Sequence, residues 1–363
     1  MNSSEPLRFR GHIPGLDVLR GVAISMVVLF HGVDGRAAYQ SFDGAAQVLV
    51  YLTSWGAAGV HLFYVLSGFL ITGIIVDGGS DQSFFSKFYK RRACRILPAY
   101  FLLLVLLKAT GHVSWNFVLA AVLFIANMAG MVGASSNEYG PMWSLAVEEQ
   151  FYLVWPWIAR NRPLRPLSLW IAVYCLGSLV ALGALSRFAP HVDFRYKLWG
   201  NAPWLLTGAL IAVCLRSGAL NRANINRWTL ALVVGAVVTS PIVALMDSGM
   251  PVSPWFTPLY RLPFVLLFAA LVLRMIARND GRTPDETRGA ARVLAFLGYI
   301  SYGLYLIHQY VFDVFDHFTV GTWLMPSLHH IGPLWIGCAA CFAISTLLAF
   351  LSRRFFESIF LRK

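Results

Sequence analysis

Runs of apolar residues recur along the whole chain and are separated by short polar stretches. Runs of about 20 residues are typical of helices that cross a lipid bilayer. The candidate membrane segments are 17–35, 48–76, 96–110, 117–133, 144–160, 167–186, 198–216, 228–246, 259–277, 293–316 and 330–351. The pattern therefore predicts an all-α polytopic membrane protein.

Basic residues gather at the ends of these segments, in clusters at 8–10, 87–95, 160–165, 216–227, 274–292 and 353–363. Positively charged loops stay in the cytoplasm, which places every cluster on that side. Three segments separate Arg95 from Arg160, although two cytoplasmic clusters must be joined by an even number of crossings. Segments 96–110 and 117–133 are both short, so we expect one to be re-entrant or interfacial. About ten transmembrane helices then remain, with both termini in the cytoplasm.

Composition agrees with a membrane protein and argues against other classes. Of the 363 residues, 58% are hydrophobic and 13% are charged, whereas an average soluble domain is about 25% charged. The net charge of +12 does not predict nucleic-acid binding, because the basic residues flank apolar segments and membrane topology explains them. The five cysteines show no CxxC-type repeat and mostly lie in apolar runs, so we expect small core residues and neither a disulfide framework nor a metal site.

The chain shows no internal repeat, low-complexity stretch or soluble appendage. We therefore expect residues 1–363 to form a single membrane domain in the cell's inner membrane, with cytoplasmic tails at 1–15 and 352–363. The polar, basic start of the chain is followed by no small-residue cleavage site, so we expect no cleavable signal peptide.

Two ionisable residues, Arg20 and His31, lie eleven positions apart in the first apolar segment. Eleven helical residues rotate by about 1100°, close to three turns, and rise by roughly 16 Å. Both side chains are therefore expected on one stripe, with Asp17 placed for an i,i+3 pair with Arg20. Such groups are costly in hydrocarbon, which favours a stripe facing a protein interior or a wet cavity. Alternatively, Asp17 and Arg20 are interfacial anchors, and His31 only bonds a neighbouring helix.

Four further stretches place polar or small residues inside apolar sequence: GVHLFYVLSGFLIT at 59–72, FYKRRACRILPAYF at 88–101, MWSLAVEEQFYLVWP at 142–156 and LGYISYGLYLIHQYV at 297–311. In the first, we expect Ser67 and Gly68 to interrupt the helix and to permit close helix packing. In the third, Glu148 and Tyr152 are spaced to share a helix face, whereas Glu149 points about 100° away.

Taken in this order, and with RRFFESIFLRK at the C-terminus, these stretches resemble the acyltransferase-3 family of integral membrane O-acyltransferases. The resemblance extends from Leu16 to Lys363. It implies three motif matches, which are the Arg-x10-His pair at Arg20 and His31, the RxxR motif at Arg92 and Arg95, and the family glutamate at Glu148.

Two departures from the family pattern matter for the function. His61 stands where the family often has an acidic residue, so any role of that acid is in doubt here. Some relatives also carry an esterase-like C-terminal domain, and without it we expect the membrane domain to act alone or with a partner.

The resemblance implies acyl-CoA, an anionic cytoplasmic molecule, as the acyl donor. Arginine forks bind phosphate through paired hydrogen bonds. The candidate donor-binding residues are Arg20, Arg91, Arg92 and Arg95. The alternative is that the basic cluster only marks the cytoplasmic end of a helix.

His31, Glu148 and Asp17 are the catalytic candidates. His31 is either the general base for an attacking hydroxyl or the site of an acyl-histidine intermediate. Glu148 orients His31 or neutralises Arg20, or it forms a charge pair that only holds two helices in register. His308 is expected to pack and to form hydrogen bonds, with acceptor binding as the alternative.

The sequence thus predicts an enzyme that moves an acyl group, expected to be acetyl, from acyl-CoA to a hydroxyl of a glycan, a lipid-linked sugar or a glycosylated small molecule. We expect contact with membrane lipid, no permanently bound cofactor, no metal and no nucleic-acid partner. The alternative is a proton-coupled secondary transporter that uses the His, Arg and Glu side chains as a relay, although the chain shows no paired inverted repeat.

Overall fold

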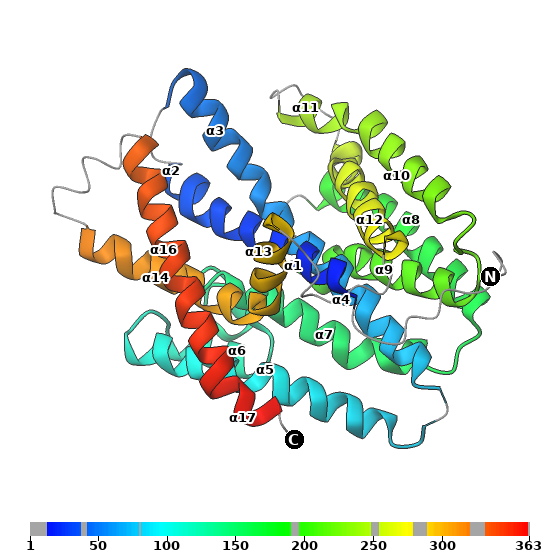
Figure 1. Ribbon diagram of the computed structural model, residues 1–363, viewed down its shortest axis with the longest axis horizontal. Helices are drawn as coiled ribbons and strands as arrows, with labels where there is room; N and C mark the ends of the chain where they lie inside the picture. Colours follow the sequence, from blue (N-terminus) through cyan, green and yellow to red (C-terminus); the bar gives the residue numbers. More distant parts are fainter. Residues whose placement is uncertain are drawn as a thin grey trace. The chain divides into compact units, whose positions relative to one another are not determined.

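The computed structural model describes residues 13–37, 42–79, 81–189, 196–247, 254–278, 289–319 and 331–361. Within these ranges the chain forms helices joined by turns, and it contains no β-strand (Figure 1). The all-α architecture predicted from the apolar runs is confirmed for this part of the chain.

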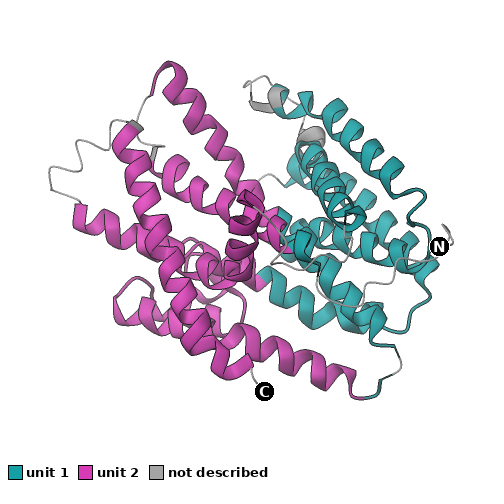
Figure 2. Ribbon diagram, in the orientation of Figure 1, with its two compact units in different colours: residues 1–16, 62–82, 147–283 teal, residues 17–61, 83–146, 284–363 magenta. Residues whose placement is uncertain are grey.

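The chain divides into two compact units (Figure 2). The first unit comprises Met1–Leu16, Leu62–Gln82 and Val147–Thr283, and the second comprises Asp17–His61, Ser83–Ala146 and Pro284–Lys363. Each unit is therefore built from segments that lie far apart in the sequence. The division falls inside the helices that begin at Pro14, Ala58 and Pro141.

The described elements that lie wholly or mostly in the second unit carry most of the predicted site residues. They are α1 (Pro14–Leu29), a π-helical turn (Phe30–Asp34), α2 (Gly35–Ala37), α3 (Gly44–Ser54), a 3₁₀ turn (Trp55–Ala57), α5 (Phe84–Ala109), α6 (Trp115–Val122), a second 3₁₀ segment (Ala126–Val132), α13 (Ala290–Tyr299), α14 (Ser301–Thr319), α16 (Ile331–Leu351), a π-helical turn (Ser352–Glu357) and α17 (Ser358–Leu361).

The first unit is an assembly of helices that pack on one another, notably α10 against α12 and α8 against α9. Its described elements are α4 (Ala58–Asp77), α7 (Pro141–Ala159), α8 (Leu164–Phe188), α9 (Leu198–Arg216), α10 (Ile225–Thr239), α11 (Pro241–Asp247), a 3₁₀ segment (Pro254–Arg261) and α12 (Leu262–Ala277), of which α4 and α7 begin in the second unit.

Seven described helical stretches are long and apolar enough to cross a membrane, or up to eight if one bent pair counts as a single span. They are Pro14–Asp34, Gly44–Asp77, Leu164–Phe188, Leu198–Arg216, Ile225–Val243, Pro258–Ala277 and Gly332–Leu361. The protein is therefore a multi-pass membrane protein. The prediction of ten crossings with both termini in the cytoplasm stays a prediction.

Three of the eleven segments predicted from the sequence do not meet this test. The segment predicted at 96–110 lies almost wholly in α5, a longer helix that begins at Phe84 and includes the basic cluster. Lysine and arginine are good helix formers, so the helix continues through them. In segment 117–133, α6 has 8 residues, about 12 Å of helix, which is too short to span a bilayer. Helix α7 is continuous over 19 residues, but polar residues that include Glu148 and Glu149 lower its mean hydropathy.

The segment predicted as one helix at 293–316 is broken in the structure. Helices α13 and α14 meet at Ile300 with a bend of 82°. The apolar pattern continues through the break, so hydropathy gives no sign of it. The bend allows α13 to cross α1 at Gly298 while α14 brings His308 to His31.

The predicted interruption of a helix at Ser67 and Gly68 is also wrong, because α4 is continuous from Ala58 to Asp77. The predicted close packing is confirmed. A Cβ atom on Gly68 would overlap the backbone of α9 at Leu205, and one on Gly208 would overlap the backbone of α4 at Val65. The small residues serve helix packing and leave the helix intact.

Glycines also set the closest approach between α1 and α13. A Cβ atom on Gly21 would overlap the carbonyl oxygen of Leu294, and one on Gly298 would overlap the carbonyl oxygen of Asp17. The two backbones therefore touch directly beside Asp17, a contact that small residues permit in membrane proteins.

We expect Gly21→Ala and Gly298→Ala each to lower the thermal unfolding midpoint of the purified protein in detergent. A methyl group at either position must push two backbones apart, and such overpacking costs about 1–3 kcal/mol. Gly177→Ala in α8 is the matched control, because a Cβ atom there meets nothing within 4 Å. Equal midpoints for all three variants would contradict the direct contact of α1 with α13.

Candidate active site

The first helix carries the predicted charge pair near its start. Arg20 donates from Nη1 to Oδ1 of Asp17 at 2.8 Å, with 22% and 13% of the two side chains exposed. The expected i,i+3 pair is therefore confirmed. Its partial burial makes it more than a fully solvated surface contact, which contributes about 0–1 kcal/mol.

His31 lies at the other end of the same helix, in the π-helical turn, and its ring is only partly buried. Its Nδ1 atom lies 3.0 Å from the carbonyl oxygen of Val27 and 3.2 Å from Nε2 of His308. Within the described ranges, both of its hydrogen-bond contacts involve Nδ1. Its Nε2 atom has no hydrogen-bond partner among the described residues.

His308 is the fully buried partner of His31. Its Nδ1 atom lies 2.8 Å from the carbonyl oxygen of Tyr305 and 3.2 Å from that of Leu304. The centroids of the two imidazole rings are 5.0 Å apart. The expectation that His308 packs and forms hydrogen bonds is therefore confirmed, and its neighbour is the catalytic candidate itself.

The π-helical turn aligns a second polar residue with His31. The N–H of Gly35 donates to the carbonyl oxygen of Phe30, an i+5 bond that brings residues five apart onto a similar face. Arg36 accordingly reaches α14, where it pairs with Asp316 and lies over the ring of Phe312 at 5.7 Å. The Arg36–Asp316 pair was not predicted from the sequence. The only hint was that Asp316 follows His308 by eight residues in the same apolar segment.

Tyr139, just before α7, and Ser144, within α7, contact the part of α14 that carries His308. The hydroxyl of Tyr139 donates to the carbonyl oxygen of Leu306 at 2.5 Å and accepts from the N–H of Tyr310 at 3.2 Å. Burial raises the pKa of Tyr139 well above its ordinary value, so its hydroxyl stays protonated as a donor. The hydroxyls of Ser144 and Tyr305 lie 2.5 Å apart. Both contacts bracket the turn of α14 that carries His308.

The basic stretch lies in the first half of α5. Arg91 and Arg95 are exposed, whereas Arg92 is half-buried with its guanidinium 5.9 Å from the ring centre of Phe88. The hydroxyl of Tyr302 donates to the carbonyl oxygen of Ile96 at 2.8 Å and ties the start of α14 to this region. Arg91 and Arg95 therefore lie at the surface of the second unit.

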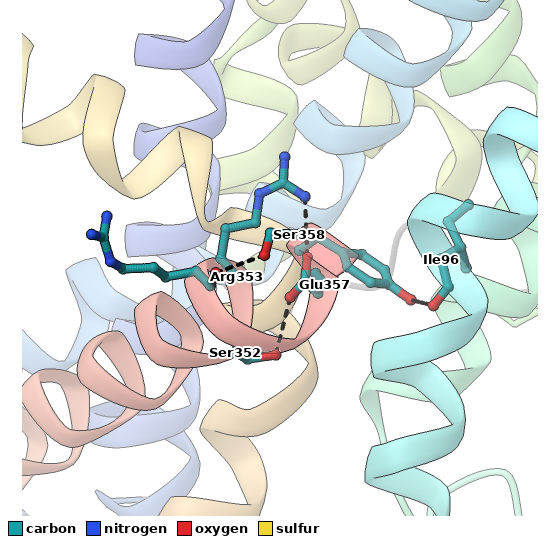
Figure 3. Close-up of polar contacts among 7 residues, drawn as sticks. Ile96, Ser352, Arg353, Glu357 and Ser358 are labelled. Carbon is teal, nitrogen blue, oxygen red and sulfur yellow. Dashed lines mark hydrogen bonds and ion pairs between the residues drawn. The ribbon is translucent and has the colours of Figure 1, made fainter. Parts of the chain in front are cut away.

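The C-terminal π-helical turn lies against α5 (Figure 3). Glu357, whose residue is 3% exposed, accepts hydrogen bonds from Ser352 and Arg353, each at 3.2 Å. The guanidinium of Arg353 also lies 5.0 Å from the ring centre of Tyr299. The buried carboxylate of Glu357 therefore holds the side chains of Ser352 and Arg353 in the turn that contacts α5.

Glu148 belongs to the first unit, whereas His31 and Arg20 belong to the second. Its carboxylate accepts from the hydroxyl of Ser67 at 2.9 Å and from that of Tyr152 at 3.2 Å. The predicted shared face of Glu148 and Tyr152 is confirmed. The role of Glu148 in orienting His31 or neutralising Arg20 stays a prediction.

An apolar cleft of about 730 Å³ lies in the second unit between α5, α14 and α16. Leucine, valine, isoleucine and phenylalanine side chains dominate its lining, with Tyr310, Thr319 and Ser352 among the few polar members. Such a lining suits a hydrocarbon chain, and its side chains include no acid–base pair. The candidate chemistry therefore lies at the two histidines.

Comparisons with known proteins show which family the chain resembles. A family model described as an acyltransferase domain matches residues 13–353. The chain is 26% identical over 335 residues to the peptidoglycan O-acetyltransferase OatA of Listeria monocytogenes, which covers 82% of this chain and 49% of that relative. It is 25% identical over 328 residues to the O-acetyltransferase OatA of Staphylococcus aureus, covering 82% and 50%.

Nodulation protein 10 of Rhizobium leguminosarum bv. viciae is 31% identical over 331 residues, which is 83% of each chain. The chain spans about half the length of the peptidoglycan O-acetyltransferases that it matches. No solved structure matches the chain.

The charge pair on α1 can be tested with a double-mutant cycle of Asp17→Asn and Arg20→Gln, measured as thermal unfolding midpoints and unfolding free energies. We expect Asp17→Asn to be more destabilising with Arg20 present than in the Arg20→Gln background, with a coupling of about 1 kcal/mol. Asp43→Asn is the matched control, since Asp43 is exposed and forms no capping hydrogen bond. Additive effects would show that the pair contributes nothing.

Proposed function

The chain belongs to the acyltransferase-domain family, and we propose that it is a membrane O-acyltransferase in which His31 is the reacting residue. The observation that carries this proposal is the state of the His31 ring. Its Nδ1 is engaged with Val27 and His308, while no described residue bonds its Nε2. A histidine held in this way is equipped to exchange a proton with a substrate.

In the proposed step, Nε2 of His31 takes the proton of an acceptor hydroxyl as its oxygen attacks the thioester carbonyl carbon. The new C–O bond forms, the C–S bond breaks, and the thiolate of the donor leaves with the proton from the imidazolium. The alternative, in which the acyl group first forms a bond to His31 and then passes to the hydroxyl, uses the same nitrogen. In either case no permanently bound cofactor is needed.

Acyl-CoA, and acetyl-CoA in particular, is the proposed donor. The exposed Arg91 and Arg95 and the half-buried Arg92 offer guanidinium forks to its phosphates. The C-terminal π-helical turn, which contacts α5, carries Arg353 and Arg354. Arg20, paired with Asp17 on the helix of His31, is the proposed contact for the part of the donor nearer the thioester.

The proposed acceptor is a hydroxyl of a glycan, a lipid-linked sugar or a glycosylated small molecule. The support comes from the names of two relatives, a peptidoglycan O-acetyltransferase and an O-acetyltransferase. We place the protein in the cytoplasmic membrane, with lipid around its apolar helices. Family membership does not favour the transporter hypothesis.

We expect His31→Ala to lower turnover of acetyl-CoA by the purified full chain, measured as release of free thiol, by about 100- to 10,000-fold, because removal of a general base has effects of this size. The matched control is His317→Ala, since His317 is exposed on α14. Thermal midpoints would verify that both variants are folded. Turnover above a tenth of the wild-type value in folded His31→Ala would refute the assignment.

We expect Arg92→Ala and Arg95→Ala to raise the KM for acetyl-CoA with a smaller effect on kcat, because these residues contact the donor away from the reacting bond. Higher ionic strength should mimic part of the effect, since salt screens exposed charges. Lysine at either position should restore binding only in part, as it lacks the guanidinium fork. Arg165→Ala removes the same charge from α8 and should leave KM unchanged; an equal rise there would indicate a net-charge effect only.

A further inference from the structure

We propose that His308 is a positioning residue that fixes the tautomer of His31 and thereby makes Nε2 of His31 the nitrogen that reacts. The inference rests on the proposed function, in which His31 takes part in acyl transfer. It is carried by four contacts, of which three involve His308 and two involve His31, with one joining the two rings.

The tautomer of His308 follows from its surroundings. Its Nδ1 atom faces the carbonyl oxygens of Leu304 and Tyr305 at 3.2 and 2.8 Å, and a carbonyl oxygen can only accept. Nδ1 must therefore carry a proton. His308 is fully buried and no carboxylate contacts its ring within the described ranges, which disfavours a charged imidazolium. A neutral ring has one proton, so Nε2 of His308 is an acceptor.

The tautomer of His31 then follows in turn. Its Nδ1 atom faces two acceptors, Nε2 of His308 at 3.2 Å and the carbonyl oxygen of Val27 at 3.0 Å. Only a protonated Nδ1 satisfies either of them. The lone pair of a neutral His31 therefore resides on Nε2, which is the nitrogen without a described hydrogen-bond partner. A half-turn of the ring would replace Nδ1 by a carbon and lose both contacts.

His308 adds what the Val27 carbonyl cannot supply alone. Val27 lies one turn before His31 on the same helix, so its carbonyl holds the nitrogen close to its own backbone. His308 approaches from α14 and is itself held by backbone carbonyls. The turn of α14 around it is fixed by Tyr139 and by the contact of Ser144 with Tyr305. The ring of His31 is thus oriented from a second, rigid element.

The test compares His308→Gln with His308→Leu in the purified full chain, with acetyl-CoA turnover as the readout. Glutamine can present an amide oxygen to the N–H of His31, whereas leucine fills a similar space without an acceptor. We expect His308→Leu to lower kcat by roughly 10- to 100-fold with KM unchanged, less than the loss of about 10⁴ seen when a catalytic histidine loses its orienting partner entirely. His308→Gln should lose several-fold less.

A packing role for His308 predicts the opposite order, because an apolar leucine then replaces the buried ring better than a glutamine does. Equal kcat for His308→Leu and the wild type, with His31→Ala inactive, would overturn the inference and leave the proposed function intact. An active His31→Ala would instead refute the proposed function. Loss of activity to the same extent in both His308 variants would exclude the acceptor role.

A second measurement does not depend on turnover or on the folding of a His308 variant. Nitrogen NMR of the wild-type chain with ¹⁵N-labelled histidine, assigned by comparison with His31→Ala, reports which ring nitrogen of His31 carries the proton. We expect the proton on Nδ1 of His31. A signal from His31 protonated on Nε2 would overturn the inference.

Discussion

The contact between His31 and His308 is the interaction on which the second unit's chemistry depends. A polar group inside a membrane protein must find a partner or pay the cost of desolvation. The two imidazoles satisfy this requirement for each other, and backbone carbonyls satisfy the remaining Nδ1 of His308. Burial and hydrogen bonding of one ring therefore leave the other with a single available nitrogen. The same four contacts hold both rings in place.

Local departures from regular helix geometry make this contact possible. The π-helical turn at Phe30–Asp34 brings His31 and Arg36 toward one face, where α14 offers His308 and Asp316. The 82° bend before α14 lets α13 lie on α1 while α14 approaches it further along. Glycines at the crossings allow the backbones to touch, which small residues make possible in membranes. The π-helical turn and the bend both lie in the elements that carry the two histidines.

Electrostatics divides the second unit into two regions with different tasks. Along α1 and beside His31, charges are neutralised in pairs, as in Asp17 with Arg20 and Arg36 with Asp316. On the first half of α5, arginines are exposed and in excess, and the C-terminal turn adds further positive charge held by a buried Glu357. In the proposed function, the excess positive charge attracts the anionic donor, and the neutral surroundings of His31 suit its proton transfer.

The sequence by itself determined the all-α membrane class, the Asp17–Arg20 pair and the shared face of Glu148 and Tyr152, because hydropathy and helical spacing are local properties. It could not determine the break at Ile300, since the helices bend there within an unbroken apolar pattern. The pairing of His31 with His308 joins residues 277 positions apart. Only the tertiary structure decided it, because a hydrogen bond between two helices depends on how their backbones bend and cross.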